Sequence, residues 1–149
     1  PKCGVDYQSK ISGPMFDRID LHVEVPAVSA ADLSRPANSE SSATIAKRVA
    51  QARNIQRQRF LQIGNTELRT NAEADGNLLE KIAAPVNEGR VLLTEATEKM
   101  RLTARGYHRI LRVARTLADL DGYDEIGRVH IAEALAYRRV VPGRQLVNM

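Results

Sequence analysis

This sequence contains few aromatic residues and no tryptophan. Aromatic residues make up 4% of its 149 residues, so a hydrophobic core has to be built from Leu, Ile, Val and Ala. Such a composition favours helices over a β-sandwich, because strands are enriched in aromatic side chains. Hydrophobic residues at 43% and charged residues at 27% are sufficient for a folded core and argue against global disorder.

The sequence also lacks a second cysteine and any long apolar segment. Cys3 is the single cysteine, which excludes an internal disulfide, and no zinc-ligand set surrounds it. There is no run of about 18 apolar residues and no charged-then-apolar leader. We therefore expect a cytoplasmic protein with no metal site and no membrane partner. Because the chain starts at Pro1 without an initiator Met, we expect it to be part of a longer protein.

The excess of positive charge is small. The net charge is +4, from 22 basic and 18 acidic residues, and the isoelectric point is about 9.5. This balance permits an anionic partner but does not require one.

One short segment alternates between apolar and polar side chains. Residues 19–25 read IDLHVEV, which predicts a half-buried or edge strand, and Pro26 ends it. The sequence contains no second convincing strand. Because a single strand cannot satisfy its own backbone hydrogen bonds, we expect its partners to lie outside this sequence or in another chain.

The chain divides into four parts. We expect residues 1–25 to be the end of a sheet-containing α/β unit and residues 26–41 to be a linker rich in Pro, Ser and Ala. From Ser42 the apolar residues recur at helical spacing, which predicts a bundle of four or five helices over residues 42–139. Residues 140–149 are expected to be a tail. The predicted fold class is therefore mainly α, preceded by a remnant strand.

The most informative helix is predicted after Thr103, which is expected to cap its N-terminus, and it is expected to end at Gly122. At 100° per residue, Arg105, Arg109 and Arg112 share the face opposite the apolar stripe. No acidic residue lies three or four positions from these arginines before Asp119. A solvated helix face is the ordinary explanation of such a row.

Two features favour a different explanation for the row. The usual acidic partners are missing, and Arg105 lies in the first turn, where a cation opposes the positive end of the helix dipole. An anion held by the free N–H groups and by the guanidinium would account for both features, and phosphate is the obvious candidate.

Arg18 also has two explanations. It lies between Asp17 and Asp20 and could form a local ion pair with either carboxylate. Alternatively, it is an arginine presented at the edge of the predicted strand to a phosphate on a neighbouring molecule.

Several long motifs carry a family resemblance over roughly residues 8–139. They are KISGPMFDRIDLHVEVPAV, ESSATIAKRVAQAR, RTNAEADG and RLTARGYHRILRVARTLADLDG followed by HIAEALAYR. With these motifs the chain resembles the C-terminal part of the magnesium-chelatase-like AAA+ ATPases of the ComM/YifB type. The resemblance implies that the strand is the last one of the α/β ATPase core and that the helices form the lid domain over the nucleotide.

The resemblance also implies roles for single residues. Arg18 matches the arginine finger, which reaches the γ-phosphate of the adjacent subunit, and Arg105 matches the sensor-2 arginine, which contacts the nucleotide of its own subunit. Both would be catalytic, and Arg105 would also bind nucleotide. Arg109 and Arg112 match no assigned role, so they are either part of a solvated face or contacts to nucleic acid or to another subunit.

The sequence has no G-x-x-x-x-G-K-[ST] loop and no acidic pair for magnesium. We therefore expect this chain alone to be inactive and monomeric, with no cofactor bound. For the full-length protein the resemblance implies an ATPase that uses ATP and Mg²⁺, works as a homo-oligomeric ring, expected to be a hexamer, and acts on DNA in uptake and recombination.

Two alternatives belong to other functional classes. The helices could be a stand-alone module that binds DNA phosphates through Arg105, Arg109, Arg112 and Lys47 or Arg48, or they could be an oligomerisation bundle.

Overall fold

The computed structural model describes residues 15, 18–23, 25–29 and 39–138, and all structural statements below concern this part of the chain. It confirms a mainly helical fold. The elements are α4 (Ser42–Gln62), a short 3₁₀ turn η1 (Asn71–Glu73), α5 (Gly76–Ile82), α6 (Asn87–Lys99), α7 (Ala104–Asp121) and α8 (Arg128–Ala136).

Local capping determines where two of the helices begin. The Thr44 N–H donates to Ser41 Oγ at 3.2 Å at the start of α4, and the Gly106 N–H donates to Thr103 Oγ1 at 3.0 Å at the start of α7. Helix α7 ends at Gly122, whose φ of 76° is the left-handed conformation that glycine adopts without strain. The caps at Thr103 and Gly122 agree with the sequence prediction.

Helix α6 begins without a side-chain cap. Asn87 is the first residue of the helix, and Val86 occupies the N-cap position without a side-chain hydrogen bond. The Val86 N–H instead donates to the carbonyl of Ile126 at 3.0 Å. A backbone contact between distant segments therefore sets the start of α6.

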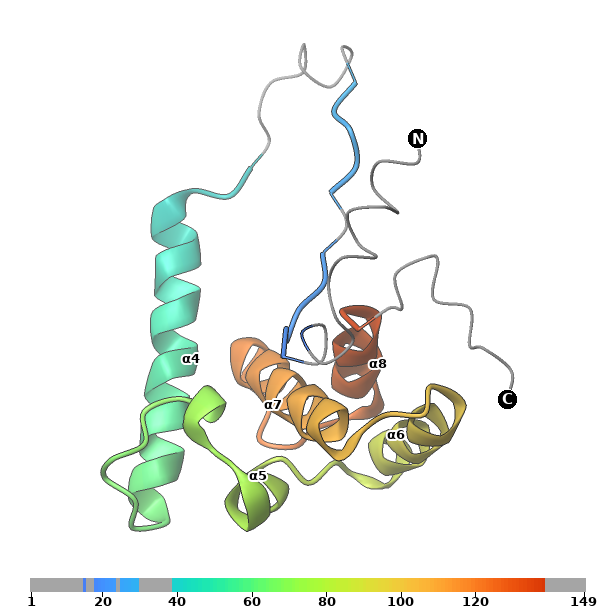
Figure 1. Ribbon diagram of the computed structural model, residues 1–149. Coiled ribbons are helices and arrows are strands. Elements are labelled where there is room, and N and C mark those ends of the chain that lie inside the picture. Colours follow the sequence, from blue (N-terminus) through green and yellow to red (C-terminus); the bar gives the residue numbers. More distant parts are fainter. Residues whose placement is uncertain (1–14, 16–17, 24, 30–38, 139–149) are drawn as a thin grey trace.

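Helix α7 is the centre of the bundle. It lies between α4 and α8, and it also contacts α5, while α6 packs against α8 (Figure 1). Its buried residues include Ile110, Leu111, Ala114 and Ala118. The largest buried apolar side chains that pack with them are Phe60, Leu79, Leu93, Ile126 and Ile131. This core has one aromatic side chain, in agreement with the composition.

Only the second half of α4 packs against the bundle. Ala52, Gln56 and Phe60 are buried, whereas every residue from 42 to 51 is exposed. In Figure 1 these first turns extend away from the other helices. Ile45 and Val49 lie on the same side of α4 as Ala52 and remain 42% and 45% exposed.

The strand predicted over residues 19–25 is not present in the described part of that segment, namely residues 19–23 and 25. No other described segment lies beside it as a strand, so its backbone groups have no ladder to join. The His22 N–H instead donates to the carbonyl of Tyr137, just after α8, at 2.8 Å. The predicted tail over residues 140–149 and Cys3 lie outside the described residues.

Candidate functional site

The N-terminus of α7 carries no negative charge of its own. No acidic residue lies in the first turn, and Arg105 is its second residue. Gly106 is buried there, and a β-carbon at this position would lie 3.4 Å from Thr103 Oγ1 and 3.6 Å from Arg138 Nη2. The local sequence therefore gives a capped, closely packed helix start whose dipole is not compensated by a carboxylate.

A groove with a volume of about 280 Å³ lies along this end of α7. Its lining residues are Asp75, Ala104, Arg105, His108, Arg109 and Arg112. The structure thus brings together the three arginines that the sequence placed on one helix face. Asp75 is the carboxylate in this lining, and two further carboxylates, Asp20 and Glu80, pair with Arg109 and His108 from beside it. Among the described residues, Arg105 is therefore the guanidinium of the groove whose charge is not matched by a carboxylate.

Arg105 is the most available of the three arginines. It is exposed, and it forms no ion pair within 4.0 Å of any described carboxylate. A guanidinium at a helix N-terminus without a carboxylate partner is suited to bind a phosphate group through charge-assisted hydrogen bonds.

Arg109 and Arg112 have partners that the sequence did not indicate. Arg109 forms an ion pair with Asp20, and its Nε is buried without a hydrogen-bond partner in the described part of the chain. Arg112 Nε donates to the carbonyl of Ala74 at 2.9 Å, and its Nη2 donates to Asp75 Oδ1 at 3.1 Å. The absence of neutralising acids, inferred from spacing within the helix, therefore holds for Arg105 and is wrong for these two.

His108 was missed by the sequence reasoning. Its Nε2 lies 3.5 Å from Glu80 Oε1, and its side chain is 27% exposed. The signal that could have identified it is its spacing, because His108 follows Arg105 by three positions and precedes Arg112 by four. It adds a second type of hydrogen-bond donor to the groove.

Arg18 is exposed in a turn, where its N–H donates to the carbonyl of Met15 at 3.0 Å. It is not among the residues that line the groove. The ion pair of Asp20 is with Arg109 rather than with Arg18, while Asp17 lies outside the described residues. Lys47 and Arg48 also lie away from the groove, and Arg48 is hydrogen-bonded to Glu40.

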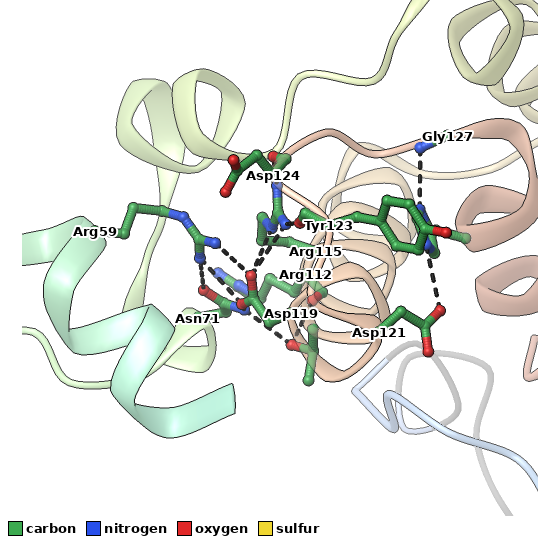
Figure 2. Close-up of polar contacts among 11 residues, drawn as sticks. Arg59, Asn71, Arg112, Arg115, Asp119, Asp121, Tyr123, Asp124 and Gly127 are labelled. Carbon is green, nitrogen blue, oxygen red and sulfur yellow. Dashed lines mark hydrogen bonds and ion pairs between the residues drawn. The ribbon is translucent and has the colours of Figure 1, made fainter. Parts of the chain in front are cut away.

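The opposite end of α7 contains a buried polar cluster, formed by Arg59, Asn71, Arg115 and Asp119 (Figure 2). The Asp119 carboxylate accepts hydrogen bonds from Asn71 Nδ2 at 2.8 Å and from Arg115 Nε at 3.1 Å, and it also pairs with Arg59. Because Arg59 is on α4 and Asn71 is in η1, the cluster fixes α4 and η1 against α7.

Arg115 is held from both sides in this cluster. Its Nη1 and Nη2 donate to the carbonyls of Asp124 and Tyr123, each at 2.6 Å. Burial lowers the pKa of Arg115, and the Asp119 carboxylate opposes this shift by favouring the charged form. These groups are occupied with one another, so we assign the cluster to the fold rather than to ligand binding.

The described residues contain neither a metal-binding cluster nor a membrane-spanning helix. No group of three or more His, Cys, Asp or Glu side chains there has an arrangement that could hold a metal ion. None of the helices there combines the length and the apolar character needed to cross a bilayer.

The fold and the groove define a helical domain that presents a basic surface at the start of its central helix. The sequence model of the magnesium chelatase subunit ChlI C-terminal family matches residues 39–138, and that of the magnesium chelatase subunit ChlI matches residues 1–33. The chain therefore belongs to the magnesium chelatase ChlI C-terminal family, as its motifs predicted.

The curated relatives are longer proteins. The chain is 37% identical over 136 residues to the competence protein ComM of Haemophilus influenzae. This match spans 91% of the chain and 25% of ComM. It is 34% identical to the YifB protein of Salmonella typhimurium, in a match that spans 94% of the chain and 26% of YifB. It is 39% identical to the protein Rv2897c of Mycobacterium tuberculosis, in a match that spans 89% of the chain and 26% of Rv2897c. The chain thus spans about a quarter of the length of these relatives.

Proposed function

We propose that this chain is the lid of an AAA+ ATPase and that its basic groove binds the phosphate groups of ATP. The observation that carries the proposal is the position of Arg105, exposed and without an ion pair among the described residues, in a groove that it shares with His108, Arg109 and Arg112. Positive side chains that converge on an uncompensated helix N-terminus favour a polyphosphate over a neutral ligand.

In the full-length ATPase the two proposed catalytic arginines act on different nucleotides. Arg105 contacts the phosphates in its own subunit, and Arg18 reaches the γ-phosphate bound to the adjacent subunit of a hexameric ring. Mg²⁺ and the phosphate-binding loop are supplied by the ATPase core. The guanidiniums stabilise the charge that develops on the transferred phosphoryl group, and closure of the lid couples the nucleotide state to motion of the ring.

The biological setting rests on family membership. One relative is named a competence protein. We infer from this that the full-length protein acts on DNA during uptake and recombination, in the cytoplasm. This part of the proposal does not depend on the geometry of the groove.

The groove is tested with the 149-residue chain itself. Sodium tripolyphosphate, titrated by calorimetry at low salt, is expected to bind to the wild-type chain, and affinity is expected to fall about tenfold in Arg105→Ala because one charge-assisted contact is lost. Arg53→Ala is the matched control, because Arg53 is exposed on α4 and is not part of the groove. Equal binding by wild-type chain and Arg105→Ala would overturn the proposal.

The catalytic roles are tested in the full-length protein. Arg18→Ala is expected to lower ATP turnover by about 10³-fold, as is typical when an arginine finger is removed. Mixing Arg18→Ala subunits with subunits that cannot bind ATP tests whether Arg18 acts across the interface. Unchanged turnover in both Arg18→Ala and Arg105→Ala would leave the oligomerisation bundle as the explanation.

A second candidate is favoured by the charge of α4, which has five basic residues and no acidic residue. Four of these, Lys47, Arg48, Arg53 and Arg57, are exposed, and Arg48 is paired with Glu40. A stand-alone module of this kind would bind nucleic-acid phosphates with a steep dependence on salt. Titration of the chain with duplex and single-stranded DNA at two salt concentrations distinguishes the two candidates. Salt-dependent DNA binding is expected of the stand-alone module, whereas the lid function does not require that the chain binds DNA.

A further inference from the structure

The segment that carries Arg18 is attached to the helix that carries Arg105. Asp20 forms an ion pair with Arg109, one helical turn after Arg105. Two hydrogen bonds hold the same segment, one from the His22 N–H to the carbonyl of Tyr137 at 2.8 Å and one from Arg138 Nη1 to the carbonyl of Ile19 at 3.5 Å. The turn with Arg18 is therefore positioned by contacts to α7 and to the end of α8.

Arg109 belongs to two arrangements at once. It lines the basic groove, and it is also the partner of Asp20. Its side chain is 16% exposed, and its Nε has no hydrogen-bond partner among the described residues. The same side chain therefore pairs with the Asp20 carboxylate and lines the groove in which an anion would bind.

We propose that Arg109 is an exchangeable link: it holds Asp20 when the groove is empty and is drawn to phosphate when the groove is filled, which releases the segment carrying Arg18. The inference rests on the proposed function, because it requires that the groove binds a polyphosphate. Asp20 and Arg109 are positioning residues for Arg18, and neither is assigned a contact with the reacting atoms.

The physical reason is competition between two anions for one guanidinium. A polyphosphate carries more charge than the single carboxylate of Asp20, whose side chain is 49% exposed and close to water. The carboxylate also repels an anion bound beside Arg109. Binding of the anion and attachment of the segment therefore oppose each other, and by linkage each weakens the other to the same degree.

The amide of His22 reports on the attachment of the segment, because its N–H is hydrogen-bonded only when the segment lies against Tyr137. We would measure its hydrogen exchange by NMR in the 149-residue chain, with and without saturating sodium tripolyphosphate at constant pH and ionic strength. Exchange at His22 is expected to accelerate about fivefold on binding. Exchange at Ile110, which is buried in α7, is expected to stay unchanged.

Two variants make the test specific. Asp20→Asn is expected to bind tripolyphosphate about fivefold more tightly than the wild-type chain and to show fast exchange at His22 even without the anion. Asp75→Asn removes the other carboxylate near the groove, while the amide oxygen can still accept from the Gly76 N–H. It is expected to bind the anion more tightly as well, but to leave exchange at His22 in the free chain at the wild-type rate.

The outcomes separate the two proposals. If tripolyphosphate binds and exchange at His22 stays the same or slows, the link is not exchangeable and this inference is overturned, while the groove remains a phosphate site. If Asp20→Asn does not increase the affinity, the opposition between the two anions is also overturned. If tripolyphosphate does not bind to the wild-type chain, the proposed function fails, and this inference fails with it.

Discussion

The two ends of α7 use arginine in different surroundings. At the C-terminal end, the side chain of Arg115 is 2% exposed, and its partner Asp119 is completely buried. At the N-terminal end, Arg105 is exposed without an ion pair among the described residues, and Arg109 and Arg112 pair with carboxylates that are 49% and 77% exposed. Buried charges must be paired, whereas exposed charges can be left available. The same helix therefore holds the fold together at one end and leaves an exposed arginine without a described carboxylate partner at the other.

The largest effect is expected from Asp119→Ala. The substitution leaves Arg59 and Arg115 beside each other without the carboxylate that both of them contact, so unfolding should require about 3–5 kcal/mol less free energy. Urea denaturation followed by circular dichroism measures this loss. Asp20→Ala is the control at the other end of α7, with an expected cost of about 1 kcal/mol or less. An equal loss of unfolding free energy in the two variants would contradict the conclusion that the charges at the two ends of α7 contribute differently to stability.

Arg115→Met compared with Arg112→Met tests the two ends with the same chemical change. Arg115→Met is expected to cost about 3 kcal/mol, because it leaves Asp119 with fewer donors and the carbonyls of Tyr123 and Asp124 without theirs. Arg112→Met is expected to cost about 1 kcal/mol, because the carboxylate of its partner Asp75 is 77% exposed and can be solvated by water instead. Thermal unfolding of both variants in one buffer gives the comparison, which would be contradicted if Arg112→Met were the more damaging.

Arg105→Ala should leave the stability of the chain within about 0.5 kcal/mol of the wild type, because the side chain is exposed and has no carboxylate partner among the described residues. Combined with the loss of tripolyphosphate affinity, an unchanged melting curve would show that this arginine serves binding and not folding. A large loss of stability would instead show that Arg105, like Arg115, stabilises the fold.

The smallest effect concerns pH and the segment that carries Arg18. Burial, and secondarily the positive charge of Arg138, lower the pKa of His22 below its ordinary value of about 6.5. The attached segment thus prefers neutral His22, and its attachment weakens as pH falls from about 6.5 towards the lower pKa of the attached form. The protection factor of the His22 amide, which corrects for the intrinsic pH dependence of exchange, is expected to decrease between pH 7.5 and 5.5. His22→Gln should remove this decrease, and an increase at acid pH would contradict the assignment.

Much of the fold could be predicted, because it depends on neighbours in the sequence. Ser41, Thr103 and Gly122 cap helices through contacts within a few residues, and the apolar side of α7 follows from helical periodicity. Whether residues 19–25 form a strand could not be predicted from sequence neighbours alone. Its alternating pattern is real, but a strand also requires a neighbouring strand, which the pattern does not supply.

The candidate site was predicted in part. Arg105, Arg109 and Arg112 share a groove because they share a helix face, and the spacing of His108 would have added it to the group. The Arg115–Asp119 ion pair also has helical spacing and could have been predicted. The assignment of Arg18 and Arg105 to nucleotide phosphates came from the family resemblance and stays a prediction.

The sequence by itself determined the helices of this protein, the caps of α4 and α7 and the face on which the arginines lie, because these features depend on residues up to about four positions apart. Only the tertiary structure decided which arginines are paired. Asp75 is 37 residues from Arg112, Asp119 is 60 residues from Arg59, and Asp20 is 89 residues from Arg109. Packing brings these carboxylates to their guanidiniums, and it leaves Arg105 as the exposed arginine of the groove without a described partner.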